Sequence, residues 1–195
     1  KIKKTLPQRN PRDNPSNIFK FKQHQVILDL VIMFNIIYRC LKILHVVHSK
    51  NGTIMFVGNN LELKKLFYVF KSKTIAKASF FISNKWLSGL ITNWAKILFF
   101  VNTIQASKPF LKKSKRLRFF RYFFVLQKKN KPDLVVVFNS TKKITLFKEC
   151  QQENIPVMSI SSLNQNYLSS FQIQANSNNV LIAWVFLQLF INPLK

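Results

Sequence analysis

The most constraining stretch of this sequence is residues 134–138, which read Leu-Val-Val-Val-Phe. A strand with one side in water alternates apolar and polar residues, whereas this run has no polar residue at all. Three consecutive β-branched valines also favour a strand over a helix. The run therefore predicts a central strand that is buried on both faces. Strands of this kind are typical of parallel sheets that are covered by helices on both sides.

Other apolar runs alternate with helical patterns along much of the chain. Further strands are predicted at 53–57, 78–83, 155–160 and 170–173. Helices are predicted at 24–48, 61–73, 86–104, 141–154 and 179–191. Alternation of strands with helices implies a parallel sheet joined by right-handed crossovers. We therefore expect an α/β fold of the flavodoxin-like (Rossmann-like) type, with a parallel sheet flanked by helices.

The alternation is interrupted before the central strand. Residues 108–131 hold ten Lys and Arg residues and no acid, interleaved with Phe and Leu. We predict an extended basic N-terminal arm over 1–23, which contains three prolines, and a single α/β domain formed by 24–94 and 132–195. Between the two parts of that domain, 95–131 is predicted to be an inserted basic helical element.

Charge points to the class of partner. The chain has 31 Lys and Arg residues against 6 Asp and Glu, a formal net charge of +25. Such a chain repels itself and suits a polyanion, for which nucleic acid and membrane headgroups are the candidates. A membrane span is not expected, because Asp29 and Asn35 break the apolar run 26–38, and the run 180–191 is shorter than the roughly twenty residues a span needs.

Catalytic and metal-binding patterns are sparse. Glu149 and Glu153 lie four residues apart on one predicted helix and are interpreted as solvated charges that pair with Lys. Asp133 precedes the central strand, and no nucleophile motif accompanies these acids. His24, His45 and His48 form no metal-ligand pattern, and the isolated Cys40 and Cys150 indicate plain thiols in a reduced compartment. We expect no metal, no cofactor and no small-molecule substrate.

A phosphate site could be formed by the segment Gly58-Asn59-Asn60, which follows a predicted strand and opens a predicted helix. Neither of the glycine-rich nucleotide-binding fingerprints is present. A nucleotide-binding flavodoxin-like enzyme therefore stays a minor alternative. A basic peripheral membrane-surface protein is a second alternative, because 108–131 combines cations with Phe and Leu.

One block, Asn-Lys-Trp-Leu-Ser-Gly-Leu-Ile-Thr-Asn-Trp at 84–94, carries a family resemblance. Together with Phe-Val-Gly at 56–58, Pro-Asp at 132–133 and Ile-Pro-Val at 155–157, it resembles the second protein of the small ribosomal subunit in its bacterial-type form. The order of these motifs holds over nearly the whole chain. The matching residues of the block are Asn84, Trp86, Leu87, Gly89, Thr92 and Asn93, with Trp94 following as it often does in the family. Lys85 replaces an Arg of the family pattern, and Ser88 replaces a Gly.

The resemblance implies a structural constituent of the small ribosomal subunit and not an enzyme. Its partners would be small-subunit rRNA and neighbouring ribosomal proteins, at a position between the head and the body of the subunit. The residues expected to contact RNA are Lys85, Asn93, Lys112, Lys113, Lys115, Arg116, Arg118, Arg121 and, more weakly, Lys128, Lys129 and Lys131. Trp86 and Leu87 are expected to anchor in the core.

Composition indicates the compartment. Phe, Ile, Asn and Lys make up 83 of the 195 residues, and all four can be encoded by A and T alone. Such a bias is typical of AT-rich genomes, often those of organelles. With the divergence from the family pattern, it predicts a mitochondrial ribosome, and a plastid or an AT-rich bacterium is the alternative.

Overall fold

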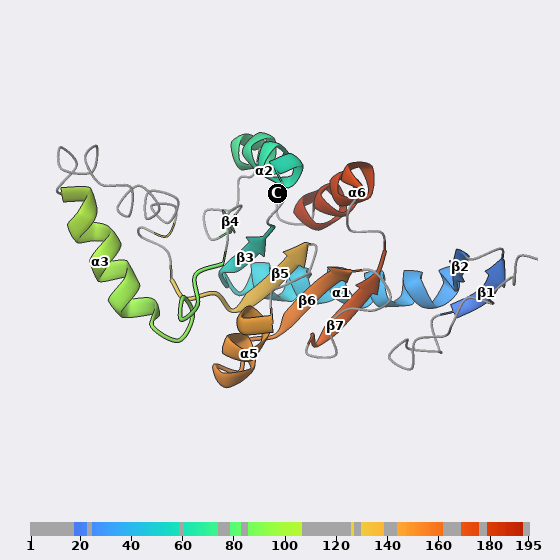
Figure 1. Cartoon of the computed structure of the whole chain (residues 1–195), viewed down its shortest axis with the longest axis horizontal. Helices are drawn as coiled ribbons and strands as arrows, with labels where there is room; N and C mark the ends of the chain where they lie inside the picture. The colour runs from blue at the N-terminus through green and yellow to red at the C-terminus, as the bar shows by residue number, and fades with distance from the viewer. Residues whose placement is uncertain are drawn as a thin grey trace, which may run out of the picture.

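The computed structural model describes residues 18–22, 25–58, 61–73, 79–82, 86–106, 126, 130–138, 144–161, 169–175 and 179–192. At its centre is a five-stranded parallel sheet (Figure 1). Its spatial order is β4 (Phe80–Ile82), β3 (Ile54–Val57), β5 (Leu134–Phe138), β6 (Val157–Ser161) and β7 (Phe171–Gln174). Counted along the chain, this is the 2-1-3-4-5 order of flavodoxin-like sheets. The predicted fold class is confirmed.

Strand β5 lies at the middle of the sheet, as its uninterrupted apolar sequence predicts. Its neighbours are β3 and β6. Val135 of β5 pairs with Met55 of β3 on one side and with Val157 of β6 on the other. All five residues of β5 are buried. Because successive side chains point to opposite faces, Val136 packs into one apolar cluster and Val137 into the other.

Helices cover both faces of the sheet. The first face is closed by α1 (Leu30–Ser49), α2 (Leu61–Lys73) and α6 (Val180–Ile191), which share one apolar cluster with the sheet. The second face is closed by α5 (Ile144–Gln152) and the start of α3 (Trp94–Ala106), which share the other cluster. In Figure 1, α3 extends beyond the β4 edge of the sheet, away from the remaining helices.

The chain enters the domain through a hairpin, not through a helix that starts at residue 24. Strands β1 (Ile18–Lys22) and β2 (Gln25–Leu28) pair in antiparallel fashion. Helix α1 begins after Asp29, whose carboxylate accepts hydrogen bonds from the backbone N–H groups of Val31 and Ile32. Asp is a favourable N-cap, so it starts the helix instead of interrupting an apolar run. The prediction of a helix from residue 24 was wrong here, and strand β1 lies within the segment 1–23 that was predicted to be an extended arm.

Helix α1 is buried on one side only, through Ile37, Cys40 and Leu44. An 18-residue window of this 20-residue helix has a mean hydropathy of 1.8, so by length and composition the helix could cross a membrane, and 17% of that window is buried. Core helices pass the same test, and Cys40 and Leu44 of α1 are completely buried in the first apolar cluster. Its opposite side is exposed. Large apolar side chains are exposed there, at Leu30, Val31, Phe34, Tyr38 and Val46.

The remaining boundaries fall close to their predictions. Helix α2 has the predicted bounds, and α5, α6, β6 and β7 differ by a few residues at their ends. Asn51, with φ at 55°, and Gly52 form the turn after α1. The predicted arm before residue 18 and most of the predicted insertion, 107–125 and 127–129, lie outside the described residues.

Candidate nucleic-acid interface at the root of the insertion

The block that carries the family resemblance forms a turn that leads into α3. A helix from Trp86 was expected, but residues 88–93 are turns and α3 begins at Trp94. Gly89 has φ at 83°, a conformation that L-residues with a side chain rarely adopt. An added Cβ there would also lie 2.9 Å from Nδ2 of Asn93. Glycine is therefore required at this position, and its conformation keeps the helix from starting earlier.

The turn is held by a buried carboxylate from α5. Glu149 is 7% exposed, and its Oε1 accepts hydrogen bonds from the backbone N–H of Gly89, at 2.7 Å, and the indole Nε1–H of Trp86, at 3.2 Å. Its Oε2 accepts the backbone N–H of Ile91 at 3.1 Å. The interpretation of Glu149 as a solvated charge that pairs with Lys was wrong. The three donors compensate the carboxylate for its loss of water.

Apolar side chains of the same turn anchor it to the second face of the sheet. Leu90 and Ile91 are fully buried, and Trp94 is 8% exposed, with its ring 6.0 Å from that of Phe80. Trp86 and Leu87 are partly buried against the same cluster, as the sequence suggested. The indole N–H of Trp94 has no hydrogen-bond partner among the described residues.

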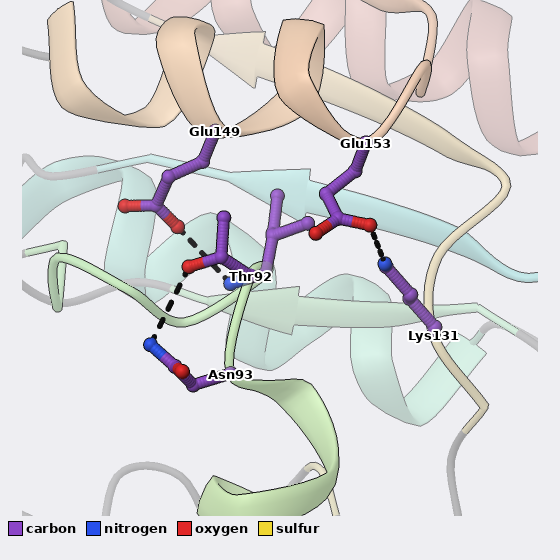
Figure 2. A network of polar contacts seen from close by, with 6 residues as sticks. Thr92, Asn93, Lys131, Glu149 and Glu153 are labelled. Carbon is purple, nitrogen blue, oxygen red and sulfur yellow. Dashed lines mark hydrogen bonds and ion pairs between the residues drawn. The ribbon is translucent and has the colours of Figure 1, made fainter.

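Between these anchors the turn exposes a short polar edge. Thr92 and Asn93 are exposed, and so is Lys96 in the first turn of α3. The Asn93 amide donates a long hydrogen bond of 3.5 Å to Oγ1 of Thr92 (Figure 2). Hydroxyl and amide groups of this kind form hydrogen bonds with phosphate and ribose oxygens, and a lysine beside them neutralises phosphate. The predicted contact residue Asn93 is therefore accessible.

The returning end of the insertion also meets α5. Lys131 forms an ion pair with Glu153, one helical turn beyond Glu149 (Figure 2). Glu153 therefore pairs with Lys as predicted. Two residues further on, the Asp133 carboxylate accepts the backbone N–H of Thr53 at 2.7 Å, and the Asp133 N–H donates to the Thr53 carbonyl at 2.8 Å. This exchange joins the start of β5 to the start of β3.

The structure describes only part of the predicted RNA-binding set. Asn93 and Lys131 fall within the described residues, on the two ends of the insertion. The other predicted RNA contacts lie outside the described residues: Lys85, Lys112, Lys113, Lys115, Arg116, Arg118, Arg121, Lys128 and Lys129. Asn84 of the structural motif also lies outside them.

The structure does not support the phosphate site considered at Gly58. The Gly58 N–H is bonded to the Ile82 carbonyl at 2.9 Å, so it is not free to hold an anion. A Cβ at Gly58 would lie 3.0 Å from side-chain atoms of both Leu63 and Phe67. The space above this glycine is therefore filled by α2, and the glycine serves close helix packing. Asn59 and Asn60 lie outside the described residues.

Nucleophilic and metal chemistry also find little support. A hollow of about 420 Å³ next to the end of α5 is lined by amide, hydroxyl and apolar side chains and by Cys150. Burial, together with the charge of Glu149, raises the pKa of Cys150 to about 12, so this thiol is not a nucleophile near neutral pH. Within the described ranges, no group of three or more His, Cys, Asp or Glu residues could hold a metal ion.

Sequence reasoning missed the role of Glu149, although the helical period contained a signal. Leu146, Phe147 and Cys150 form the buried stripe of α5. Glu149 lies three residues after Leu146 and directly before Cys150, so it falls on that stripe and not on the solvated side. An acid on an apolar helix face requires a buried partner.

Comparison with known proteins matches nearly the whole chain to one family. A family model described as Ribosomal protein S2 matches residues 7–192. The small ribosomal subunit protein uS2c of Galdieria sulphuraria is 30% identical over 153 residues, which cover 72% of this chain and 64% of that protein. The uS2c protein of Chlorella vulgaris is 25% identical over 198 residues, which cover 90% and 72%. The uS2 protein of Methylocella silvestris is 26% identical over 172 residues, which cover 80% and 48%. The matched segments thus span between about half and three quarters of these relatives.

Proposed function

Because this chain belongs to the ribosomal protein S2 family, we propose that it is a structural constituent of a small ribosomal subunit and that it binds small-subunit rRNA. The observation that carries the proposal is the family match over residues 7–192, which includes the central sheet and the turn that Glu149 holds. The net charge of +25 agrees with a polyanionic partner. Its role is one of binding and shape, not of catalysis.

The RNA-binding surface proposed here is the polar edge of the turn together with the insertion that follows it. Electrostatic contacts with phosphates are largely independent of base sequence and weaken as salt rises. Recognition of folded rRNA would then depend on where the fold places these cations. Proposed contacts are Lys85 and Asn93 at the turn, and Lys112, Lys113, Lys115, Arg116, Arg118 and Arg121 in the insertion, with Lys128, Lys129 and Lys131 as weaker ones.

Neighbouring ribosomal proteins are the partners proposed for the side of the molecule formed by α1 and α6, which contact each other. Helix α6 has no charged residue, yet Leu181, Trp184 and Val185 are exposed on it, as Phe34 and Tyr38 are on α1. The exposed apolar side of α6 has no cation, so it is better suited to protein than to RNA. On α1, the exposed cations Arg39 and Lys42 lie beside the apolar side chains, with the Lys42 ammonium 4.5 Å from the Tyr38 ring centroid. The position between head and body that the family resemblance implies would bring several proteins within reach.

The mitochondrial ribosome is the compartment proposed for this protein. The support is its composition, in which 83 of 195 residues are Phe, Ile, Asn or Lys, together with its divergence from the family pattern at Lys85 and Ser88. Fractionation of cells that express a tagged chain would test this proposal. Recovery in the mitochondrial ribosome fraction is expected, and recovery in plastids or in a bacterial cytoplasm would contradict it.

Sedimentation tests the main proposal. A tagged chain is expected to migrate with small subunits through a sucrose gradient that contains high salt, because a built-in constituent resists salt that removes loosely bound proteins. If the small subunits sediment intact while the tagged chain stays at the top of the gradient, the proposal is wrong.

A pair of charge reversals tests the RNA-binding surface. Arg116→Glu with Arg118→Glu is expected to reduce incorporation into the subunit without unfolding the domain. The matched control is Lys50→Glu with Lys65→Glu, at exposed positions after α1 and on α2, which changes the net charge by the same amount. The control is expected to incorporate at close to the wild-type level. Equal incorporation of both variants would remove the insertion from the RNA interface.

Association with a membrane surface is a second candidate, favoured by the exposed apolar side of α1. It predicts that purified chain, freed of RNA by nuclease, floats with liposomes that contain anionic lipid. We expect the chain to remain in the dense fraction under these conditions. Flotation without RNA would favour the membrane candidate over the ribosomal one.

A further inference from the structure

We propose that Glu149 and Glu153 act together as a two-point clamp that fixes both ends of the insertion against α5. Glu149 holds the outgoing end through the turn at 86–91, and Glu153 holds the returning end through Lys131. Glu149 lies in α5, and Glu153 directly follows its last residue, Gln152. The backbone N–H of Glu153 donates to the Glu149 carbonyl at 3.1 Å, so the two acids are one helical turn apart. Figure 2 shows both carboxylates directed from α5 toward the two chain segments. The clamp would set the direction in which the insertion leaves the domain.

The choice of residues supports this assignment. Six acids occur in the whole chain, and two of them are placed at the root of its most basic segment. The three donors that meet Glu149 come from residues 58 to 63 positions away in the sequence, so the contact joins separate parts of the chain. These donors require acceptors at both oxygens of the carboxylate. A Gln side chain would offer one oxygen and turn an NH₂ group toward a second donor.

The direction of α3 depends on this turn. The backbone N–H of Asn93 donates to the carbonyl of Gly89 at 2.9 Å, and α3 starts at the next residue. The helix therefore continues from a segment whose N–H groups at Gly89 and Ile91 are bonded to Glu149. A helix of 13 residues is about 20 Å long, so a tilt of about 15° at its root moves its far end by about 5 Å. That displacement is close to the separation of neighbouring phosphates.

This inference rests on the proposed RNA-binding function for its importance, but its geometry can be tested without RNA. Spin labels are placed at Phe99→Cys on α3 and Leu181→Cys on α6, both of which are exposed positions. The native Cys40 and Cys150 are fully buried and are not expected to take up label. The distance distribution between the labels then reports the direction of α3 relative to the sheet domain.

Phe99 lies five residues after the start of α3, about 7.5 Å along the helix, so Glu149→Gln is expected to shift the mean distance between the labels by about 2 Å or to broaden the distribution by that amount. The single changes Lys131→Glu and Glu153→Lys are expected to broaden it less, since the pair is partly exposed. The double change Lys131→Glu with Glu153→Lys rebuilds the pair in reverse and is expected to restore the wild-type distribution. This recovery distinguishes a clamp from a general loss of stability, because two destabilising changes would otherwise add.

Two results would overturn the clamp. One is an unchanged distance distribution in folded Glu149→Gln protein. The other is a distance distribution in the double charge reversal that differs from wild type by as much as those of the two single changes combined. If Glu149→Gln does not fold, the double charge reversal alone tests the clamp. Incorporation into small subunits is measured in parallel for each variant. If a variant loses the wild-type distance distribution between the labels but is incorporated normally, the clamp is not important for assembly. If the clamp is intact but the chain never enters small subunits, the proposed function is wrong instead.

Discussion

The two faces of the central sheet are closed in different ways. The first face is apolar throughout, with the rings of Phe56 and Phe81 stacked at 5.0 Å and Phe67 packed at 5.0 Å against Phe81. The second face has an apolar cluster of its own, but a buried carboxylate completes it. Apolar packing is non-directional, whereas hydrogen bonds to a carboxylate fix the orientation of the groups that donate them.

That difference separates two tasks within one small domain. The first face supplies area removed from water, which contributes most to the free energy of folding. The second face fixes one turn so that Thr92 and Asn93 are exposed and α3 leaves at a defined angle. We infer that stability is concentrated on the first face, and that placement of the RNA-binding surface is decided on the second.

The largest effect is expected from the centre of the first face. Phe138→Ala removes a fully buried ring that packs against Phe67 and should lower the free energy of unfolding by about 3–5 kcal/mol. Phe34→Ala, at an exposed position on α1, should change it by less than about 0.5 kcal/mol. Denaturant unfolding followed by circular dichroism measures both. Equal effects of the two changes would show that the first face does not carry the stability.

A matched pair on α5 should give an intermediate effect. Glu149→Ala leaves three N–H donors without an acceptor and should lower the free energy of unfolding by about 2–3 kcal/mol. Glu153→Ala loses a partly exposed ion pair and should cost about 0–1 kcal/mol. The same unfolding assay measures both. A loss at Glu153 as large as that at Glu149 would contradict the distinction between a buried and a solvated acid.

The turn itself should respond to a change of one methyl group. Gly89→Ala places a side chain at a φ of 83° and against Asn93, and should lower the free energy of unfolding by about 1–2 kcal/mol. Ser88→Ala is the control, since it creates the same side chain at the neighbouring exposed position and should change stability by less than about 0.5 kcal/mol. If both variants behave like wild type in thermal unfolding, the turn is not conformationally constrained.

The smallest effect should appear at the two cysteines, one on each face. Burial raises the pKa of Cys40 from 9.0 to about 12, and burial with the charge of Glu149 does the same for Cys150. Because the folded pKa values lie above the unfolded one, the contribution of the thiols to stability is complete below pH 9 and is lost as pH rises from 9 toward 12. Glu149→Gln should lower the pKa of Cys150 and leave that of Cys40 unchanged. Rates of iodoacetamide labelling between pH 8 and 10, read by mass spectrometry, would test this difference, and equal changes at both thiols would contradict it.

The elements that were predicted best are those whose own sequence contains the whole signal. The bounds of β5 follow from five apolar residues in succession, and those of α2 from an amphipathic period that ends within the same segment. The sheet order then follows from alternation and handedness. Here the local sequence and the tertiary structure favour the same conformation.

One of the errors occurred where a distant residue decides the local structure. A helix was expected over 86–104, but Glu149, about 60 positions away, fixes the N–H groups of Gly89 and Ile91 in a turn. The second error has a local cause, because residues 25–28 pair with β1, which lies directly before them, instead of extending α1. The motif residues were identified from the resemblance, while the acid that holds them was assigned to solvent. Spacing along the chain did not contain that contact.

The central claim is that RNA lies against the turn and the insertion, and protein against α1 and α6. Ultraviolet crosslinking of purified small subunits, followed by mass spectrometry of RNA-linked peptides, tests it most directly. The account predicts crosslinks within residues 84–96 and 108–131, and none at Tyr38 of α1 or Trp184 of α6, both of which are exposed and photoreactive. Crosslinks at Tyr38 or Trp184, with none in the turn or the insertion, would contradict it.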